Sequence, residues 1–393
     1  MKEKPIIVVS ATRFFQGGTI VIVNECLKFL SKNYRDNYTI KALVYDKSLY
    51  ESIEAVEWVN FPNSRKTIFH RLYDEYIGFK KLSKSWKPVR WLSLQDSTPN
   101  VDAQIRAVYF HNPLLLKPKE LNLLRHQPRL EVLRLLYKYI YTKGIRKNDM
   151  VITQQLNIAT YLKDHYNIET DRVRVFPPVN YLLNRGNTTT EKGDLLNPAV
   201  HRYSPGNRVQ DPFTFIYPAT AFYYKNHDLI LQACRLLKAR QISNFRVLLT
   251  IDGSENGQVR QLVTQAKLDL PEIEFLGFLK REKVFDYYLE SDAMVFPSLL
   301  ESWGLPLTEF AGLDKPILCA DLPYAHETLE NYSKACFFDP NNANALAKLM
   351  EEAINGSINY PAKPPIKKSE GLSQTQYLKT WEELFKLLLG TGN

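Results

Sequence analysis

Two carboxylates, Glu301 and Glu309, lie eight positions apart in the stretch VFPSLLESWGLPLTE, which runs from residue 295 to 309. The apolar residues before Pro297 predict a buried strand, and the sequence that follows Gly304 has helical character. The first turn of a helix attracts anions through its unpaired N–H groups and its dipole, and a carboxylate accepts hydrogen bonds from hydroxyls. The stretch therefore predicts a site for a ligand with phosphate and hydroxyl groups, such as a nucleotide sugar. The alternative is that Glu301 only caps the helix or is solvated.

A second candidate site lies near the start of the chain. The apolar segment PIIVVS (5–10) leads into the loop ATRFFQGG, which contains Arg13, Gly17 and Gly18, and then into a segment with helical spacing. A strand, a glycine loop and a helix are typical of nucleotide-binding domains, although the spacing is not G-x-G-x-x-G. The two glycines would let the backbone approach a phosphate closely. The alternative is a plain tight turn.

His111 follows the apolar segment RAVYF, at the predicted carboxyl end of a strand. Such ends line the ligand crevice of parallel sheets, so His111 is a candidate proton donor, proton acceptor or hydroxyl binder. The alternative is a histidine with a purely structural role.

Short apolar segments alternate with segments of helical spacing along the whole chain, which predicts parallel sheets covered on both faces. The predicted strands are 5–10, 39–45, 56–62, 89–95, 106–113, 149–155, 173–179, 213–219, 246–252, 273–279, 292–298, 315–321 and 335–340. The predicted helices include 19–33, 67–84, 119–142, 157–166, 228–240, 257–268, 281–290 and 375–390.

A polar stretch rich in Gly, Pro, Asn and Thr separates the two sets of strands. It predicts a domain of residues 1–185, a linker or insertion of 186–212, and a second domain of 213–372. The strand ends of the two domains are expected to face each other across a cleft. The last helix, within 373–393, is expected to pack back on the first domain.

The charge of the chain is unevenly distributed. Residues 1–185 carry 30 Lys and Arg against 17 Asp and Glu, whereas residues 186–393 carry 21 against 25. The excess of positive charge in residues 1–185 predicts an acidic partner: phosphate ligands, anionic lipid or nucleic acid. Two basic, aromatic-rich segments, 65–91 and 118–147, are interpreted as surface helices with one buried face or, alternatively, as helices that dock on an anionic membrane. Nucleic acid is not expected as a partner, because no recognised nucleic-acid module is present.

The four cysteines are scattered among apolar neighbours without metal-ligand spacing, and they are expected to be reduced core residues. No apolar run approaches ~18 residues, so no membrane span is expected. No signal-peptide pattern precedes the first strand, and the expected location is the cytoplasm, with peripheral attachment to the inner face of the membrane as an option.

Several segments in order resemble the retaining glycosyltransferases of family 4, whose GT-B fold consists of two Rossmann-like domains. The segments are YYKNH, RVLLTIDG, IEFLGFL, FPSLLESWGLPLTEFAGLDKPILCAD, and HET before FFDP. The resemblance is specific from about residue 213 to 340 and weaker before that.

The resemblance implies roles for individual residues. Glu301 would contact the hydroxyls of the donor sugar, and Glu309 those of the ribose. Lys225 would bind the diphosphate in place of a metal. The remaining implied contacts are Ser302, Gly304 and Leu305 at the sugar or diphosphate, Gly277 and Phe278 at the base, Gly17, Gly18 and Arg13 at the diphosphate, and His111 near the sugar and acceptor.

The sequence departs from the family pattern in two places. Ala219 and Thr220 stand where many members carry an arginine before the lysine, and Ser302–Trp303 replaces the usual Gly-Phe. Neutralisation of the diphosphate must therefore depend more on Lys225 and Arg13, and the identity of the donor is put in doubt.

The implied function is the transfer of a hexosyl group from a nucleoside-diphosphate sugar, UDP- or GDP-linked, to a glycan acceptor, free or lipid-linked, in bacterial surface polysaccharide synthesis. No metal is expected, because no Asp-x-Asp pattern is present, and no cofactor is expected beside the donor substrate. The alternatives are a nucleotide-sugar epimerase or phosphorylase of the same architecture, and a membrane-binding adaptor with a degenerate site.

Overall fold

The computed structural model describes residues 3–15, 17–117, 121–178, 211–360 and 376–390. They divide into two compact units. Unit 1 contains the described residues up to 178 together with 376–390, and unit 2 contains 211–360. Most of the predicted linker, residues 186–210, lies outside the described residues, as do the ends of the second domain and of the C-terminal segment, 361–375 and 391–393.

The sheet of unit 1 has seven parallel strands in the order β3-β2-β1-β4-β5-β6-β7. Every strand predicted in this half is present. The bounds are β1 Ile6–Ala11, β2 Thr39–Val44, β3 Val56–Asn60, β4 Arg90–Ser93, β5 Ile105–Phe110, β6 Met150–Thr153 and β7 Val173–Val175.

Strand β1 contributes side chains to two hydrophobic cores, because successive residues of a strand point to opposite faces of the sheet. Ile7 and Val9 pack with helix α1 (Gly18–Tyr34), and Val8 packs with Phe79 of α3 (Phe79–Trp86). The second face is also covered by α5 (Pro128–Gly144) and α6 (Leu156–Tyr166). The sheet is therefore buried on both sides, as the continuous apolar strands predict.

Two predicted helices of unit 1 are interrupted in the structure. The predicted helix 67–84 consists of α2 (Ile68–Tyr73), a π-helical turn at Asp74–Gly78, and α3. The predicted helix 119–142 is divided into α4 (Leu123–His126) and α5 at Gln127, because the residue before a proline disfavours helical conformation.

The C-terminal helix α13 (Trp381–Leu389) packs on unit 1, as the sequence predicts. Its apolar face joins the core on the α1 side of the sheet, where Phe385 stacks on Phe29 at 5.7 Å between ring centroids. The helix begins six residues later than predicted, because Tyr377 pairs with Val175 in a short parallel bridge and Thr380 caps the amide of Glu383.

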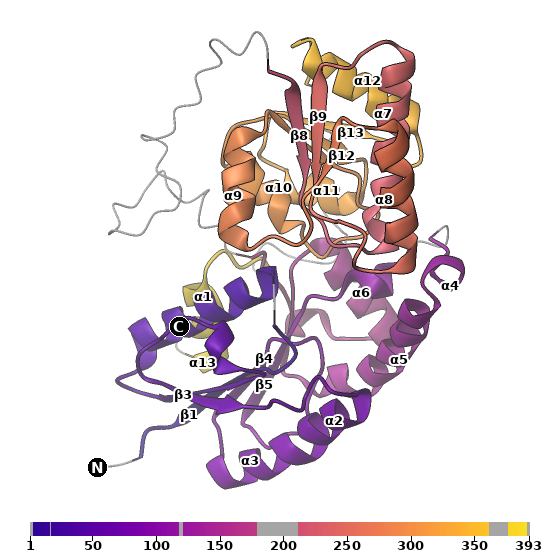
Figure 1. Ribbon diagram of the computed structural model, residues 1–393. Coiled ribbons are helices and arrows are strands. Elements are labelled where there is room, and N and C mark those ends of the chain that lie inside the picture. Colours follow the sequence, from indigo (N-terminus) through magenta and orange to yellow (C-terminus); the bar gives the residue numbers. More distant parts are fainter. Residues whose placement is uncertain (1–2, 16, 118–120, 179–210, 361–375, 391–393) are drawn as a thin grey trace. The chain divides into compact units, whose positions relative to one another are not determined.

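The sheet of unit 2 has six parallel strands in the order β10-β9-β8-β11-β12-β13. The strands are β8 Phe213–Tyr217, β9 Phe245–Leu249, β10 Ile273–Phe275, β11 Ala293–Phe296, β12 Ile317–Ala320 and β13 Ala335–Phe338. The helices are α7 His227–Ala239, α8 Gly257–Asp269, α9 Arg281–Glu290, α10 Leu305–Ala311, α11 Pro323–Thr328 and α12 Ala343–Ile354. Figure 1 shows α9 and α10 on one side of this sheet and α7, α8 and α12 on the other.

Both sheets reverse their winding direction next to their first strand. In unit 1 the chain proceeds outward from β1 through β2 and β3 and then returns to β4, on the other side of β1. In unit 2 it proceeds from β8 through β9 and β10 and returns to β11. Ligands of open parallel sheets bind at the carboxyl ends of the strands where the direction reverses. These points are therefore where the candidate site residues must be sought.

Candidate active site

Lys225 and Glu301 meet at the reversal point of the unit 2 sheet. Lys225 ends the single helical turn Tyr223–Lys225 that follows β8, and Glu301 lies in the loop after β11. The Lys225 ammonium donates a hydrogen bond of 2.5 Å to Oε1 of Glu301. The two side chains are only 14% and 11% exposed. The sequence predicts both residues at the site but assigns them to different parts of the ligand, and the structure brings them into direct contact.

Asn226 fixes the backbone on which Lys225 sits. It adopts the left-handed conformation with φ 57°, which asparagine tolerates better than most residues. Its side-chain amide donates to the carbonyls of Pro297 (3.3 Å) and Pro340 (2.9 Å) and so connects the loops after β8, β11 and β13. The Tyr217 hydroxyl also donates to the Lys225 carbonyl at 2.8 Å.

The groups around this ion pair are neutral. Burial, together with the nearby Lys225 charge, lowers the pKa of His227 to about 3. Burial and the Glu301 carboxylate raise the pKa of the Tyr224 and Tyr217 hydroxyls. Lys225 is therefore the cation that this environment presents to an anionic ligand, and Glu301 is the hydrogen-bond acceptor beside it.

The loop between Glu301 and α10 requires its glycine. Gly304 has φ 84°, and a Cβ there would lie 3.1 Å from Cδ1 of Leu307. Leu305 is the first residue of α10, and Pro306 behind it contributes no N–H to the first turn. Ser302 is half-buried, and the carbonyl of buried Trp303 accepts a hydrogen bond from the Thr328 hydroxyl. The predicted anion site can therefore draw on the Leu305 amide but not on a complete set of first-turn amides.

Glu309 lies on α10, as predicted, and is held by two side chains of α9. Its Oε1 accepts hydrogen bonds from Nε (3.2 Å) and Nη2 (2.9 Å) of Arg281, and its Oε2 accepts one from the Tyr288 hydroxyl at 3.2 Å. Burial raises the pKa of Glu309, and the hydrogen bonds and charge from Arg281 oppose that rise.

Gly277 and Phe278 form the loop after β10. Gly277 has φ 69°, and a Cβ at this position would lie 2.8 Å from Oδ2 of Asp252, in the neighbouring loop after β9. Phe278 is largely exposed, with its ring available to a planar ligand. Both loops belong to the carboxyl edge of the sheet on which Lys225 and Glu309 lie.

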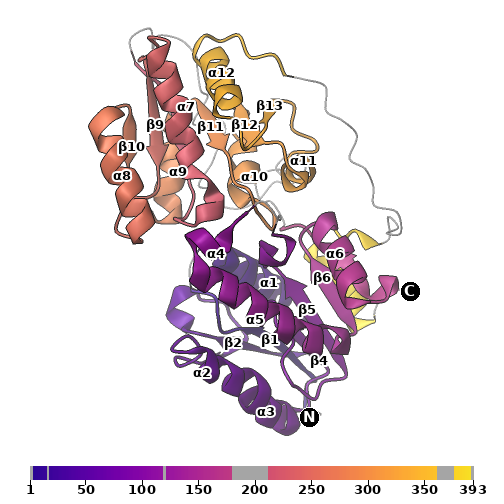
Figure 2. The same ribbon diagram turned by 90° about the vertical axis from the view of Figure 1, so that its right-hand side faces the viewer.

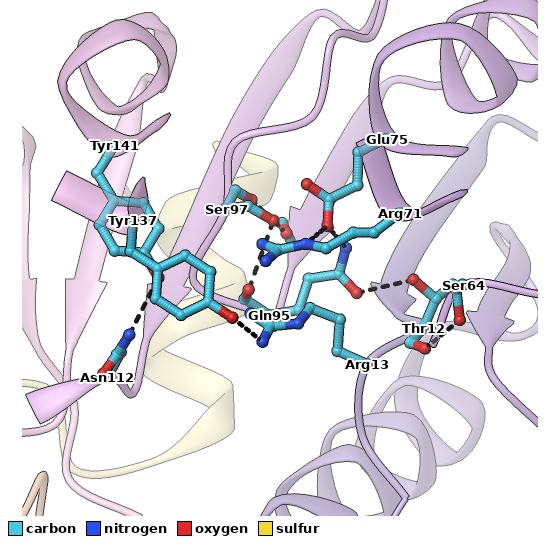
Figure 3. A network of polar contacts seen from close by, with 11 residues as sticks. Thr12, Arg13, Ser64, Arg71, Glu75, Gln95, Ser97, Asn112, Tyr137 and Tyr141 are labelled. Atoms are coloured by element: carbon cyan, nitrogen blue, oxygen red, sulfur yellow. Dashed lines mark hydrogen bonds and ion pairs between the residues drawn. The ribbon is translucent and has the colours of Figure 1, made fainter. Parts of the chain in front are cut away.

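The candidate residues of unit 1 gather at the other reversal point. Gly17 has φ 69° and precedes α1, whose first residue is Gly18. The Arg13 guanidinium donates to the Tyr137 hydroxyl and lies 5.1 Å from the centroid of its ring (Figure 3). His111 is buried between Phe14 and Tyr109. Burial lowers the pKa of His111, so the ring is neutral at pH 7.

A buried polar network supports this edge of unit 1, and the sequence did not predict it. Arg71 and Glu75 form an ion pair of 2.7 Å between Nε and Oε1 at the junction of α2 and the π-helical turn. Gln95, after β4, donates to Glu75 at 3.1 Å and accepts a hydrogen bond from Thr12, after β1, at 3.1 Å (Figure 3). The network therefore ties α2 to the two loops of the reversal point.

Three of the contacts at the unit 2 site also escaped prediction: Arg281, Tyr288 and Asn226. Arg281 and Tyr288 are seven residues apart on α9, which places them on the same face two turns apart. That spacing is the signal that could have identified them, but it does not indicate which carboxylate they contact. Among the described residues no group of His, Cys, Asp and Glu could hold a metal ion. The four cysteines are buried and free of disulfides.

Comparison with known proteins finds related sequences and structures. Residues 204–367 match the family described as Glycosyl transferases group 1. The chain is 26% identical over 168 residues to the O-antigen chain mannosyltransferase B of Escherichia coli, a match that spans 42% of each protein.

Solved structures share the fold. The glycosyltransferase WaaG, involved in lipopolysaccharide biosynthesis, is similar with a TM-score of 0.64 and 14% identity over 89% of this chain and 90% of that one. Anabaena Alr3699/HepE, solved with UDP-glucose, is similar with a TM-score of 0.60 and 14% identity over 90% of both chains. The fold is therefore GT-B, as predicted, and these findings together support a GT-B glycosyltransferase.

Proposed function

We propose that this protein is a retaining, metal-independent hexosyltransferase of family 4 that uses a nucleoside-diphosphate sugar, UDP- or GDP-linked, as its donor. The observation that carries the proposal is the Lys225–Glu301 pair, which lies at the reversal point of a domain matched by the glycosyl transferases group 1 family. A part-buried cation and a part-buried acceptor in contact suit a ligand in which a diphosphate adjoins sugar hydroxyls.

The proposed roles of Lys225 and Glu301 follow from the charges that develop during the reaction. When the bond between the sugar and the diphosphate breaks, negative charge grows on the leaving oxygen and the sugar becomes oxocarbenium-like. Lys225 would stabilise the leaving diphosphate, an electrostatic contribution that is worth most in a site that excludes water. Glu301 would hold the sugar hydroxyls in place, which lowers the entropic cost of the reaction. The leaving phosphate itself would accept the proton of the acceptor hydroxyl.

As the family resemblance implies, Arg13, Gly17 and Gly18 would bind the diphosphate, and His111 would lie near the sugar and acceptor. The acceptor would be a glycan, free or lipid-linked, in bacterial surface polysaccharide assembly such as O-antigen or capsule synthesis, and the location would be the cytoplasm. The proposed acceptor follows the roles of the O-antigen chain mannosyltransferase and of WaaG in lipopolysaccharide biosynthesis.

A donor panel tests the proposal. The purified protein is incubated with UDP-, GDP- and dTDP-sugars, with and without oligosaccharide acceptors, and released nucleoside diphosphate is measured. We expect nucleoside diphosphate to be released from one class of donor, and only when an acceptor is present. Conversion of the nucleotide sugar without an acceptor would indicate an epimerase, and phosphate-dependent release would indicate a phosphorylase. Failure to bind any nucleoside diphosphate would favour the non-enzymatic adaptor.

We further propose that unit 1 docks on an anionic bilayer. Exposed apolar side chains recur at helical spacing on two neighbouring helices: Phe69, Tyr73 and Ile77 on α2 and the π-helical turn, and Val132, Leu135 and Tyr139 on α5. Figure 2 shows α2 and α5 on the same side of the unit 1 sheet, and the Arg71 guanidinium lies 5.2 Å from the Tyr137 ring centroid between them.

The basic residues around these apolar side chains indicate that the lipid surface is anionic. Lys66, His70, Arg129 and Lys138 are exposed beside these apolar residues. Basic residues next to inserted aromatic and aliphatic side chains match an anionic surface, since each contributes separately to binding. No helix in the described parts of the chain is long and apolar enough to cross a bilayer.

Vesicle flotation tests the docking. We expect the protein to float with vesicles containing phosphatidylglycerol at low salt and not with neutral vesicles. Replacing Phe69 and Val132 together by Ser should reduce the bound fraction by about tenfold or more, because burying each side chain is worth about 1.5–3 kcal/mol. Leu268→Ser, at an exposed apolar position of α8 in unit 2, should change nothing. Flotation that is absent, or equal with neutral vesicles, would reject the proposal.

A further inference from the structure

Arg281 and Tyr288 together occupy most of the hydrogen-bonding capacity of the Glu309 carboxylate. An ionised carboxylate offers about four lone-pair sites. Arg281 uses two of them on Oε1, and the Tyr288 hydroxyl uses one on Oε2. One site remains for a ligand. A ribose whose 2′- and 3′-hydroxyls both donate to this carboxylate needs two.

We propose that Arg281 competes with the ribose of the donor for Glu309, and that its guanidinium leaves the carboxylate when a ribonucleotide binds. Arg281 is thus a specificity-determining residue that lowers the preference of the site for a ribose diol over a single hydroxyl. The inference rests on the proposed function, in which Glu309 holds the ribose.

The two partners of Glu309 differ in their freedom to move. The Arg281 side chain is 48% exposed, whereas that of Glu309 is 12% exposed and Tyr288 is fully buried. Arg281 is the first residue of α9, where a long side chain can turn into solvent without disturbing the helix. Because the Arg281 end of the pair is half-exposed, water screens the attraction and competes for the guanidinium, so a ligand can displace Arg281 at small cost.

The helix that carries Arg281 is itself fixed. The buried ammonium of Lys315 donates to three carbonyls at the end of α9: Tyr288 (3.1 Å), Leu289 (2.7 Å) and Ser291 (2.6 Å). Lysine near a helix C-terminus satisfies carbonyls that lack helical partners. The Tyr288 hydroxyl therefore stays on Glu309 while the guanidinium of Arg281 moves.

Removal of Arg281 also changes the proton affinity of Glu309. The groups that act on this carboxylate in the described residues are Arg281 and Tyr288, whose own pKa lies well above the usual value because of burial and the Glu309 charge. Burial raises the pKa of Glu309, and Arg281 lowers it. Without Arg281 the pKa of Glu309 is higher still. The carboxylate then accepts a proton, and loses an acceptor site for ribose, at a higher pH than in the wild type.

The test is calorimetric titration of the full chain with the nucleoside diphosphate that binds the wild type and with its 2′-deoxy analogue. At pH 8 we expect Arg281→Gln to bind the ribonucleotide about three- to tenfold more tightly than the wild type, since the competitor is gone. The 2′-deoxy analogue should show no gain, because its single remaining hydroxyl fits the free lone pair. As the pH falls, the gain should shrink and reverse. Lys283→Gln, on the same helix but paired with Asp286, is the matched control and should match the wild type.

Weaker binding of both ligands by Arg281→Gln would mean that Arg281 itself contacts the nucleotide, and unchanged affinity would mean that the pair is a surface contact; either overturns the inference. Glu309→Gln separates this inference from the proposed function. Loss of ribonucleotide affinity in that variant supports the ribose role whatever Arg281 does. Absence of binding to the wild type would reject the proposed function and the inference together.

Discussion

At the scale of single residues, the candidate site depends on backbone conformations that few side chains tolerate. Asn226 beside Lys225, Gly277 beside Phe278 and Gly304 before α10 all have positive φ. Each follows a different strand of the unit 2 sheet and turns the chain at the edge where the ligand is proposed to bind. These turns fix where the functional side chains can point.

Gly277 gives a direct test of this requirement. Replacing it by Ala combines a left-handed φ with a Cβ 2.8 Å from Asp252 Oδ2. We expect a loss of about 1–3 kcal/mol in the free energy of unfolding, measured by urea denaturation, and weaker nucleotide binding because the loop shifts. Gly257→Ala is the control: its Cβ would meet nothing within 4 Å, at the start of α8, so stability should be unchanged or slightly higher. Equal stability of the two variants would contradict this account of the loop.

Residue types and spacing identified Glu301 and Glu309 as candidates, because two carboxylates beside a strand end suit a hydroxylated ligand, and the family resemblance added Lys225. They did not reveal that Lys225 and Glu301 pair with each other, or that Arg281 and Tyr288 converge on Glu309. Contacts of this kind depend on which strands are neighbours, and strand order is not encoded in local spacing.

At the scale of elements, the apolar strands were predictable because a parallel sheet buried on both faces needs continuous apolar segments. The ends of the helices were less predictable. A π-helical turn at Asp74–Gly78 and the break at Gln127 arise from local backbone geometry inside segments whose apolar spacing is continuous. Helices α11 and α12 were not predicted, since α11 is a short helix between apolar strands and α12 lies beyond the last motif.

Helix α13 shows how one element contributes to a distant core. Leu384 is fully buried among residues of the α1 side, and Leu387 on the same helix is exposed. We expect Leu384→Ala to lower the free energy of unfolding by about 2–5 kcal/mol, measured by urea denaturation followed by tryptophan fluorescence, which includes buried Trp381. Leu387→Ala should stay within about 0.5 kcal/mol of the wild type. A similar loss in both variants would mean that α13 does not pack in this orientation.

At the scale of the whole molecule, two parallel sheets of the same winding pattern each have a reversal point, one containing Arg13 and Tyr137 and the other containing Lys225 and Glu301. The chain completes unit 1 only after it has built unit 2, because α13 follows unit 2 in sequence. The imbalance of charge between the two halves was visible in the sequence, whereas the return of the last helix was an expectation that the fold confirmed.

The central claim is that the Lys225–Glu301 pair is the catalytic centre of a sugar transfer. The most direct test compares nucleoside-diphosphate release by the wild type and Glu301→Gln with the donor and acceptor that the panel identifies. A thermal melt confirms folding, and Glu282→Gln, an exposed carboxylate of α9, serves as the control. We predict a loss of about 100-fold or more in turnover for Glu301→Gln, with nucleoside diphosphate still bound, and a wild-type rate for Glu282→Gln. A folded Glu301→Gln variant that turns over at the wild-type rate would contradict the claim.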